Sequence, residues 1–179
     1  MKKLMMLFVA AALTFGMSSV ASAQTSDATG TLQVSATVTG SLTLVFTKDT
    51  NGVALTSGSG TNTAALSFGN ISAFGSPAAG VTTSTTASNF TVSTPVDVTV
   101  NKFNSASANY TLKAQLNGAP GTETWAVNGA SFDNSTIGTA TATGTYGSPV
   151  AVTLAITVPF TTASGTSISN TINFTASAN

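Results

Sequence analysis

The sequence contains no cysteine, no histidine and no arginine, and only 6% of its 179 residues are charged. Proteins on average carry roughly 25% charged residues, so this composition is far from that of a cytosolic enzyme. Without a thiol or an imidazole, Ser-His-Asp and Cys-His nucleophilic systems are impossible, and so are the usual zinc and haem sites. Because all five cations are lysines, no basic surface of the kind that binds nucleic acid is expected.

The first 23 residues have the layout of a secretory signal peptide. Two lysines precede an apolar run over residues 4–15, and small residues follow up to Ala23. This order of charged, apolar and A-x-A regions is typical of a cleaved signal. The run is well short of the ~20 residues that span a bilayer, so stable membrane insertion is not expected. The sequence therefore predicts a secreted or cell-surface protein that starts at Gln24.

The predicted mature chain, residues 24–179, is poor in charge and rich in hydroxyl groups. It has three lysines against five acids, a net charge of −2, and Thr and Ser make up about a third of it. A chain of ~150 residues can bury a core as one domain without disulfides. Its stability must come from packing and backbone pairing, since it has no cysteine.

Apolar and polar residues alternate in several stretches of this chain. A period of two is typical of half-buried strands, and β-branched Thr suits the opposite face of a pleated sheet. Turn signals such as residues 51–52, 117–121, 128–129 and 147–149 separate the stretches. The sequence therefore predicts an all-β fold, a single antiparallel β-sandwich over residues 24–179. The alternating positions are Leu32, Val34, Ala36 and Val38; Leu42, Leu44 and Phe46; Val96, Val98 and Val100; Tyr110, Leu112, Ala114 and Leu116; Val150, Val152, Leu154, Ile156 and Val158; and Ile168, Asn170, Ile172 and Phe174.

An L-x-F-G-x-I element spans Leu66 to Ile71, and residues 164–175 have the pattern of a closing strand. With these features the chain resembles the secreted fimbrial-type β-sandwiches of the spore-coat-U kind, and related bacterial surface domains with an LNFG signature. The resemblance implies an immunoglobulin-like sandwich that is a subunit of a surface fibre or coat. From the residues themselves, we expect Phe68 and Ile71 to insert into the core and Gly69 to allow a bulge or a sharp strand exit.

No residue of the sequence is assigned a catalytic, cofactor-binding or metal-binding role. A glycosidase pair needs two acids a few ångströms apart, one of them with a raised pKa, which sequence does not show. Asp97 is predicted on the polar face of a strand and Asp49 beside a hairpin turn, where solvated acids usually lie. We therefore expect no enzyme and no cofactor. The acids considered are Asp27, Asp49, Asp97, Glu123 and Asp133.

Aromatic side chains are assigned to the core or to sheet faces rather than to a sugar-binding platform. A secreted adhesin or carbohydrate-binding module is the alternative function. It would be favoured by a coplanar and exposed set of Trp125, Tyr110 and Tyr146. The residues assigned to the core or to sheet faces are Phe74, Phe90, Phe103, Phe132, Phe160 and Trp125.

The segment Thr31–Val38 lies close to the predicted mature N-terminus, where chain ends are usually mobile unless tied into a sheet. Leu32, Val34, Ala36 and Val38 could form the first strand of their own sandwich, or add to an exposed edge of a neighbouring subunit. Donation to a neighbour would link subunits head to tail, and such a contact produces an open filament if it does not close. The predicted function is an exported structural protein, a subunit of an extracellular fibre or coat that self-associates through edge strands.

Overall fold

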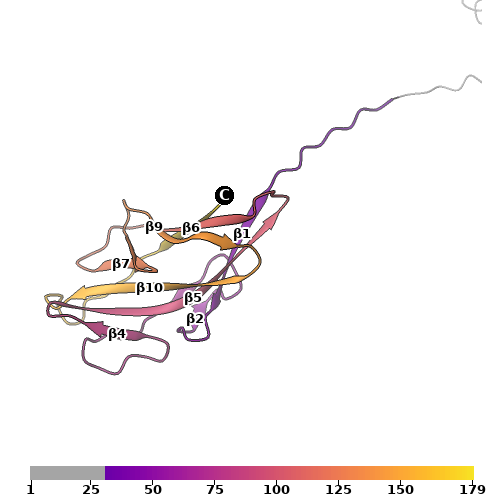
Figure 1. The fold of residues 1–179 in the computed structure, drawn as a ribbon. Helices are drawn as coiled ribbons and strands as arrows, with labels where there is room; N and C mark the ends of the chain where they lie inside the picture. Colours follow the sequence, from indigo (N-terminus) through magenta and orange to yellow (C-terminus); the bar gives the residue numbers. More distant parts are fainter. Residues whose placement is uncertain (1–30) are drawn as a thin grey trace, which may run out of the picture. The chain divides into compact units, whose positions relative to one another are not determined.

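The computed structural model describes residues 31–179, and the predicted signal peptide over residues 1–23 lies outside the described residues. Residues 31–179 contain no helix, and the strands are joined by turns and loops (Figure 1). The all-β prediction is therefore confirmed. The strands are β1 (Ser41–Lys48), β2 (Leu55–Ser57), β3 (Ala65–Leu66), β4 (Thr82–Thr85), β5 (Asn89–Phe103), β6 (Asn109–Leu116), β7 (Thr124–Val127), β8 (Ala130–Phe132), β9 (Gly138–Thr145), β10 (Pro149–Pro159) and β11 (Ile172–Ala178).

The larger sheet has the strand order β1-β5-β10-β7-β8, and β4 pairs with the part of β5 that β1 leaves free. β5 is central because its 15 residues are long enough to pair with β1 and β4 on one edge and with β10 on the other. Val92, Val96, Val98 and Val100 are all buried, as expected for alternate residues on one face of a strand.

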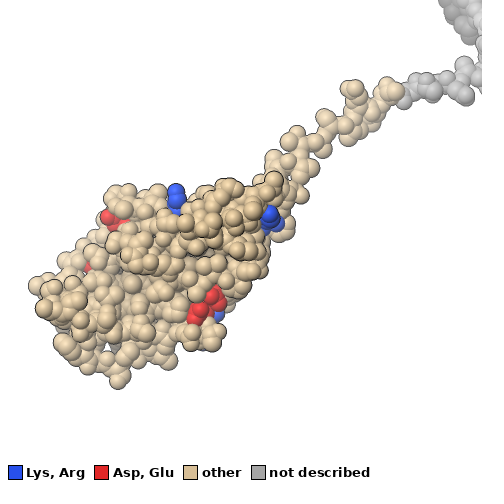
Figure 2. Space-filling view, viewed as in Figure 1, with Lys and Arg blue, Asp and Glu red and all other residues tan. Residues whose placement is uncertain are grey.

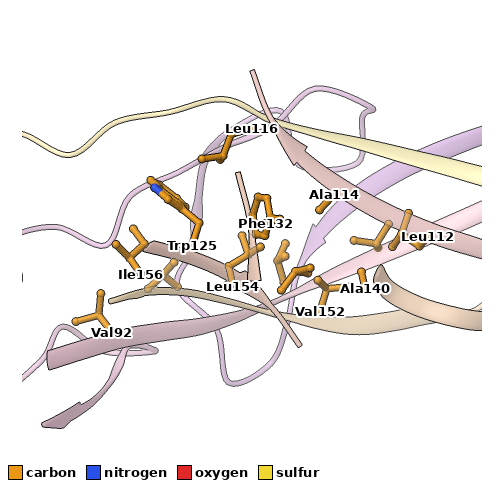
Figure 3. Packing of buried hydrophobic residues seen from close by; sticks show 14 of the residues in the cluster. Val92, Leu112, Ala114, Leu116, Trp125, Phe132, Ala140, Val152, Leu154 and Ile156 are labelled. Atoms are coloured by element: carbon orange, nitrogen blue, oxygen red, sulfur yellow. The ribbon is translucent and has the colours of Figure 1, made fainter. Parts of the chain in front are cut away.

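The smaller sheet has the order β11-β6-β9, and the two sheets enclose one hydrophobic core. Figure 3 shows Leu112 and Leu116 of β6 on one side of this layer and Leu154 and Ile156 of β10 on the other, with Trp125 beside them. The short β2 and β3 pair only with each other. The predicted β-sandwich is therefore confirmed.

The two sheets approach closely along the side where β8 leads into β9. Gly138 opens β9 so near to the larger sheet that an added Cβ would lie 3.0 Å from Phe132 Cβ and 3.1 Å from Val127 Cγ1. The connection is fixed by Asp133, whose Oδ1 accepts hydrogen bonds from the N–H groups of Ser135 and Thr136, each at 2.6 Å. On the opposite side, β1 and β11 are the edge strands.

The Asn128-Gly129 turn between β7 and β8 is confirmed. Asn128 has φ 48° and Gly129 has φ 81°, the positive values that a two-residue type I′ hairpin turn requires. The Asn128 side chain also bridges the two sheets, because its Oδ1 accepts from Thr153 N–H at 2.7 Å and its Nδ2 donates to Ala140 O at 2.7 Å.

Two predicted strands differ from the structure. The first strand begins at Ser41, and residues 31–38 carry no strand. β11 begins at Ile172 and not near Ile168. The reason is that the Asn170 side chain bonds the backbone of residue 118, accepting from its N–H at 3.1 Å and donating to its O at 2.9 Å.

Charged side chains are sparse on the surface. On the face drawn in Figure 2 most of the surface is uncharged, with a few red and blue patches, in keeping with the 6% charged content. Among residues 31–179, no helix is long and apolar enough to cross a membrane.

Candidate functional site

β1 and β11 are edge strands of opposite sheets, and their inward-facing side chains are only half-buried. Leu42, Leu44 and Phe46 of β1, and Ile172 and Phe174 of β11, are among the partly buried residues packed around the core. Among the described strands, β1 pairs in a ladder only with β5, and β11 only with β6. The rings of Phe46 in β1 and Phe174 in β11 contact each other at a centroid distance of 5.4 Å, but no described strand forms a ladder between β1 and β11.

A groove of about 1430 Å³ lies on this open side of the sandwich. Residues 42–46 of β1 and 165–174 before and within β11 line it, together with Trp125, Leu154 and Ile156 from the core. Small-molecule sites usually measure roughly 300–1,000 Å³. The groove is therefore larger than a single metabolite needs, and its size suits an extended segment of polypeptide.

The L-x-F-G-x-I element lines the same groove. Leu66, Phe68 and Ile71 are partly buried against the core. Gly69 has φ 68°, a left-handed conformation that glycine adopts without steric cost. The expected insertion is confirmed in part, since Phe68 and Ile71 pack against the core without being buried; the expected bulge or strand exit at Gly69 is not found, because β3 ends at Leu66 and Gly69 lies in the connection that follows.

The backbone N–H and C=O groups on the outer edges of β1 and β11 are hydrogen-bonded to different degrees. Phe46 N–H donates to Thr61 O at 2.9 Å, and Gly60 N–H donates to Phe46 O at 2.7 Å, so this part of β1 is already paired. β11 pairs with β6 along one edge and has no ladder on its other edge among residues 31–179. An unpaired edge offers a row of N–H and C=O groups to another strand. The outer edge of β11 is therefore the better place for an added strand.

The segment Thr31–Val38 has the form of an unpaired strand. Leu32, Val34 and Val38 are 87%, 83% and 74% exposed, and residues 31–40 carry no secondary structure. From Leu32 to Val38 an extended chain covers about 20 Å. Leu32–Val38 has the same number of residues as β11, which has 7. Its alternating apolar side chains therefore match the free edge in length and in period.

A buried carboxylate fixes Trp125 in the groove wall. Trp125 Nε1 donates to Glu123 Oε1 at 3.1 Å, and Gly121 N–H donates to the same oxygen at 3.2 Å. Burial acts to raise the pKa of Glu123, but hydrogen bonds from its own backbone, from Trp125 and from Gly121 outweigh burial and hold that pKa below its usual value. The ionised carboxylate therefore anchors the indole ring.

The structure brings two of the acids together, Asp49 and Asp97. Burial raises the pKa of Asp97, and the charge and the hydrogen bond of Asp49 raise it further. Hydrogen-bonded carboxyls are closer than the ~5 Å that retaining glycosidases use. A nearby cavity of about 390 Å³, lined by Lys48 and Gly80 among others, has neither carboxyl in its wall. These observations give no support to a catalytic role for the pair; Asp27 lies outside the described residues.

We expect Asp97→Asn to change the pH dependence of stability. Because the pKa of Asp97 is raised above 3.8 in the folded protein, its stabilising contribution is present below that pH and is lost as the pH rises through the raised pKa. The uncharged asparagine should therefore make the protein more stable than the original chain near pH 7, and no more stable near pH 3. Urea unfolding midpoints at the two pH values measure the difference.

Asp133→Asn is the matched control, and we expect it to change stability near pH 7 in the opposite direction. Hydrogen bonds from Ser135 and Thr136 lower the pKa of Asp133, so its contribution is present above the ordinary pKa and is lost as the pH falls. This variant should be less stable than the original chain near pH 7. Identical midpoints for Asp97→Asn and the original chain near pH 7 would contradict the account of the pair.

The sugar-binding platform considered from the sequence is not formed. Tyr110 is 0% exposed and Trp125 is 7% exposed. The rings of Tyr110 and Tyr146 lie at an angle of 50°, so they are not coplanar. The feature that would have favoured a carbohydrate-binding module is therefore not present in these three residues.

The assignment of aromatic residues to the core or to sheet faces is confirmed except for Phe74 and Phe160, which lie outside the strands. Phe132 and Trp125 are buried. Phe74, Phe103 and Phe160 are 86%, 54% and 41% exposed, so none of the three is a core residue. Phe90 near the start of β5 is partly buried against the core, and Phe103 at the end of the same strand is exposed on its sheet face. Phe160 follows the last residue of β10.

Residues 31–179 hold no group of three His, Cys, Asp or Glu side chains that could bind a metal ion. Comparisons of the chain with protein-family models, with curated proteins and with solved structures found no match. The resemblance to fimbrial-type sandwiches therefore stays a prediction, and the inference of function rests on the groove, the free edge of β11 and the exposed segment.

Proposed function

We propose that this protein is an exported structural surface protein, a subunit of an extracellular fibre or coat that assembles through strand pairing. In this proposal, Thr31–Val38 of one copy fills the groove of the next. The observation that carries the proposal is the pair of half-buried apolar rows on β1 and β11, with no described strand forming a ladder between them. The charge-poor, Thr-rich composition and the predicted signal peptide support the same proposal.

Strand addition combines two kinds of contact. Main-chain hydrogen bonds to the outer edge of β11 give affinity, and alternate side chains enter the groove. Fully burying a Leu or Val side chain contributes about 1.5–3 kcal/mol. Leu32, Val34 and Val38 are exposed in the described chain, so their burial supplies a driving force that offsets part of the cost of ordering the segment.

The arrangement also explains how a chain of subunits would grow. A copy that donates its segment to a neighbour still presents its own groove to a third copy. Such a contact is heterologous, because two different surfaces meet, and it generates a filament when it does not close into a ring.

Disulfide trapping tests the proposal, because a chain without cysteine reports unambiguously on introduced ones. One preparation carries Val34→Cys in the segment and a second carries Leu44→Cys in the groove wall. After mixing and oxidation we expect a disulfide-linked heterodimer of the two variants. The matched control pairs Val34→Cys with Thr153→Cys, an exposed position on the outer face of β10.

Two outcomes would contradict the proposal. One is no more product from the groove cysteine than from the Thr153→Cys control. The other is a disulfide that forms only within a single chain carrying both Val34→Cys and Leu44→Cys. The segment would then bind in the groove of its own chain.

A further inference from the structure

Three phenylalanine rings stack at one end of the sandwich, where Phe74 and Phe160 are exposed and Phe90 is partly buried. Phe160 stacks with Phe74 and with Phe90, at centroid distances of 6.0 Å and 6.2 Å and interplanar angles of 24° and 20°. We call these residues the Phe160 stack. Exposed clusters of large apolar side chains mark interaction sites, and aromatic residues are enriched in protein interfaces.

A fourth exposed aromatic residue, Phe103, lies at the opposite end. Phe103 is the last residue of β5 and Phe90 is the second, so about 43 Å of extended strand separates them. Figure 1 shows β5 running the length of the sandwich. Phe103 pairs in register with Ser41, the first residue of β1. The sandwich therefore exposes aromatic side chains at both ends of its longest strand.

The exposed segment joins the sandwich beside Phe103. Only Thr39 and Gly40 separate Val38 from Ser41. A segment seated in a neighbouring groove must therefore bring the Phe103 end of its own subunit close to the place where Val38 lies.

β11 begins at the end of the sandwich that carries the Phe160 stack. The chain after Phe160 is tied to the connection before β7, because the hydroxyls of Thr162 and Thr122 are hydrogen-bonded at 3.1 Å. The same connection bonds Asn170 through the backbone of Gly118, and β11 starts two residues later. The first residue of β11 therefore lies at the Phe160 end and its last residue at the Phe103 end.

Strand direction decides which end of the neighbour receives Val38. Every ladder between the described strands is antiparallel. A segment that adds antiparallel to β11 places its C-terminal residue, Val38, beside Ile172 at the Phe160 end. Parallel addition, which is slightly less stable per residue, would instead bring the Phe103 ends of two copies together.

We propose that the Phe160 stack is a docking surface for a second copy of this chain, whose Phe103 end stands against it. This inference rests on the proposed function, since strand donation is what brings the two ends together. The contact is head to tail, and it adds aromatic packing between subunits to the pairing of the segment with β11. It also gives the growing fibre one direction.

Cross-linking of exposed positions tests this contact. Preparations of the mature chain carrying Phe74→Cys and Phe103→Cys are mixed and treated with a short bifunctional maleimide. We expect a heterodimer linked between positions 74 and 103 as the main product. The matched control replaces Phe74→Cys with Ile137→Cys, a position 54% exposed in the β8–β9 connection. Circular dichroism melting of each variant verifies that the fold is intact.

The outcomes separate this inference from the proposed function. Products linked mainly 74 to 74 or 103 to 103, or a yield no higher than that of the Ile137→Cys control, overturn the docking surface. If separate preparations carrying Val34→Cys and Leu44→Cys still link when mixed, the failure concerns the docking surface alone. If that pair fails too, strand donation is overturned and the docking surface with it.

Discussion

Replacing Gly144 with alanine is expected to destabilise the sandwich by about 1–3 kcal/mol, the usual cost of overpacking a core. Gly144 lies in β9 directly against the ring of Tyr110, and an added Cβ would lie 2.6 Å from Tyr110 Cε1 and closer still to other ring atoms. The ring has no room to move away, because Tyr110 is fully buried and contacts the ring of Tyr146 at a centroid distance of 5.2 Å. Urea unfolding of the mature chain measures the loss.

Gly75→Ala is the matched control for this substitution. Gly75 lies in a connecting segment without a positive φ, and its nearest neighbour, Ser72, is 3.5 Å from an added Cβ. The control should unfold at the midpoint of the original chain. Equal midpoints for Gly144→Ala and Gly75→Ala would show that the Tyr110 ring is not held in place by β9.

The central strands could be predicted because large apolar residues mark their buried face. Val96, Val98 and Val100 in β5, and Leu112 with Leu116 in β6, give a clear contrast with the Asp, Thr, Lys and Gln between them. The structure buries all five. Where side-chain volume and polarity alternate together, the sequence alone is enough to place a strand and its inner face.

The strands that could not be predicted lack this contrast. β9 reads Gly-Thr-Ala-Thr-Ala-Thr-Gly-Thr, and its buried positions are Gly138, Ala140 and Gly144, which are small because larger neighbours lie against two of them. β7 and β8 have 4 and 3 residues, too few to show a period. Their positions depend on partners distant in sequence.

Only the inward-facing residues that line the groove could be predicted, not the groove itself. Alternation indicates that Leu42, Leu44 and Phe46 face inward, but whether another strand covers them depends on the arrangement of both sheets. Likewise, nothing local in the sequence shows that Asn170 bonds the backbone of residue 118 and so delays the start of β11. The exposure of Phe160 was missed for a similar reason, since it continues the inward alternation of β10 past the end of that strand.

Val34→Asp is expected to abolish assembly while leaving the sandwich folded. In the proposed contact Val34 enters the apolar groove of a neighbour, where an unpaired carboxylate costs several kcal/mol. Since each 1.4 kcal/mol is a factor of ten, association should weaken at least ~100-fold. In the isolated subunit Val34 is 83% exposed, so the substitution removes no packing there.

Ser35→Asp provides the matched control, because it adds the same charge at the neighbouring position, which faces away from the groove in an extended strand. The most direct measurement is the size distribution of the mature chain, residues 24–179, by sedimentation velocity and electron microscopy over a range of concentrations. The account predicts filaments or large polymers for the original chain and for Ser35→Asp, and folded monomers for Val34→Asp. Equal assembly of the two aspartate variants, or an original chain that stays monomeric at every concentration, would contradict it.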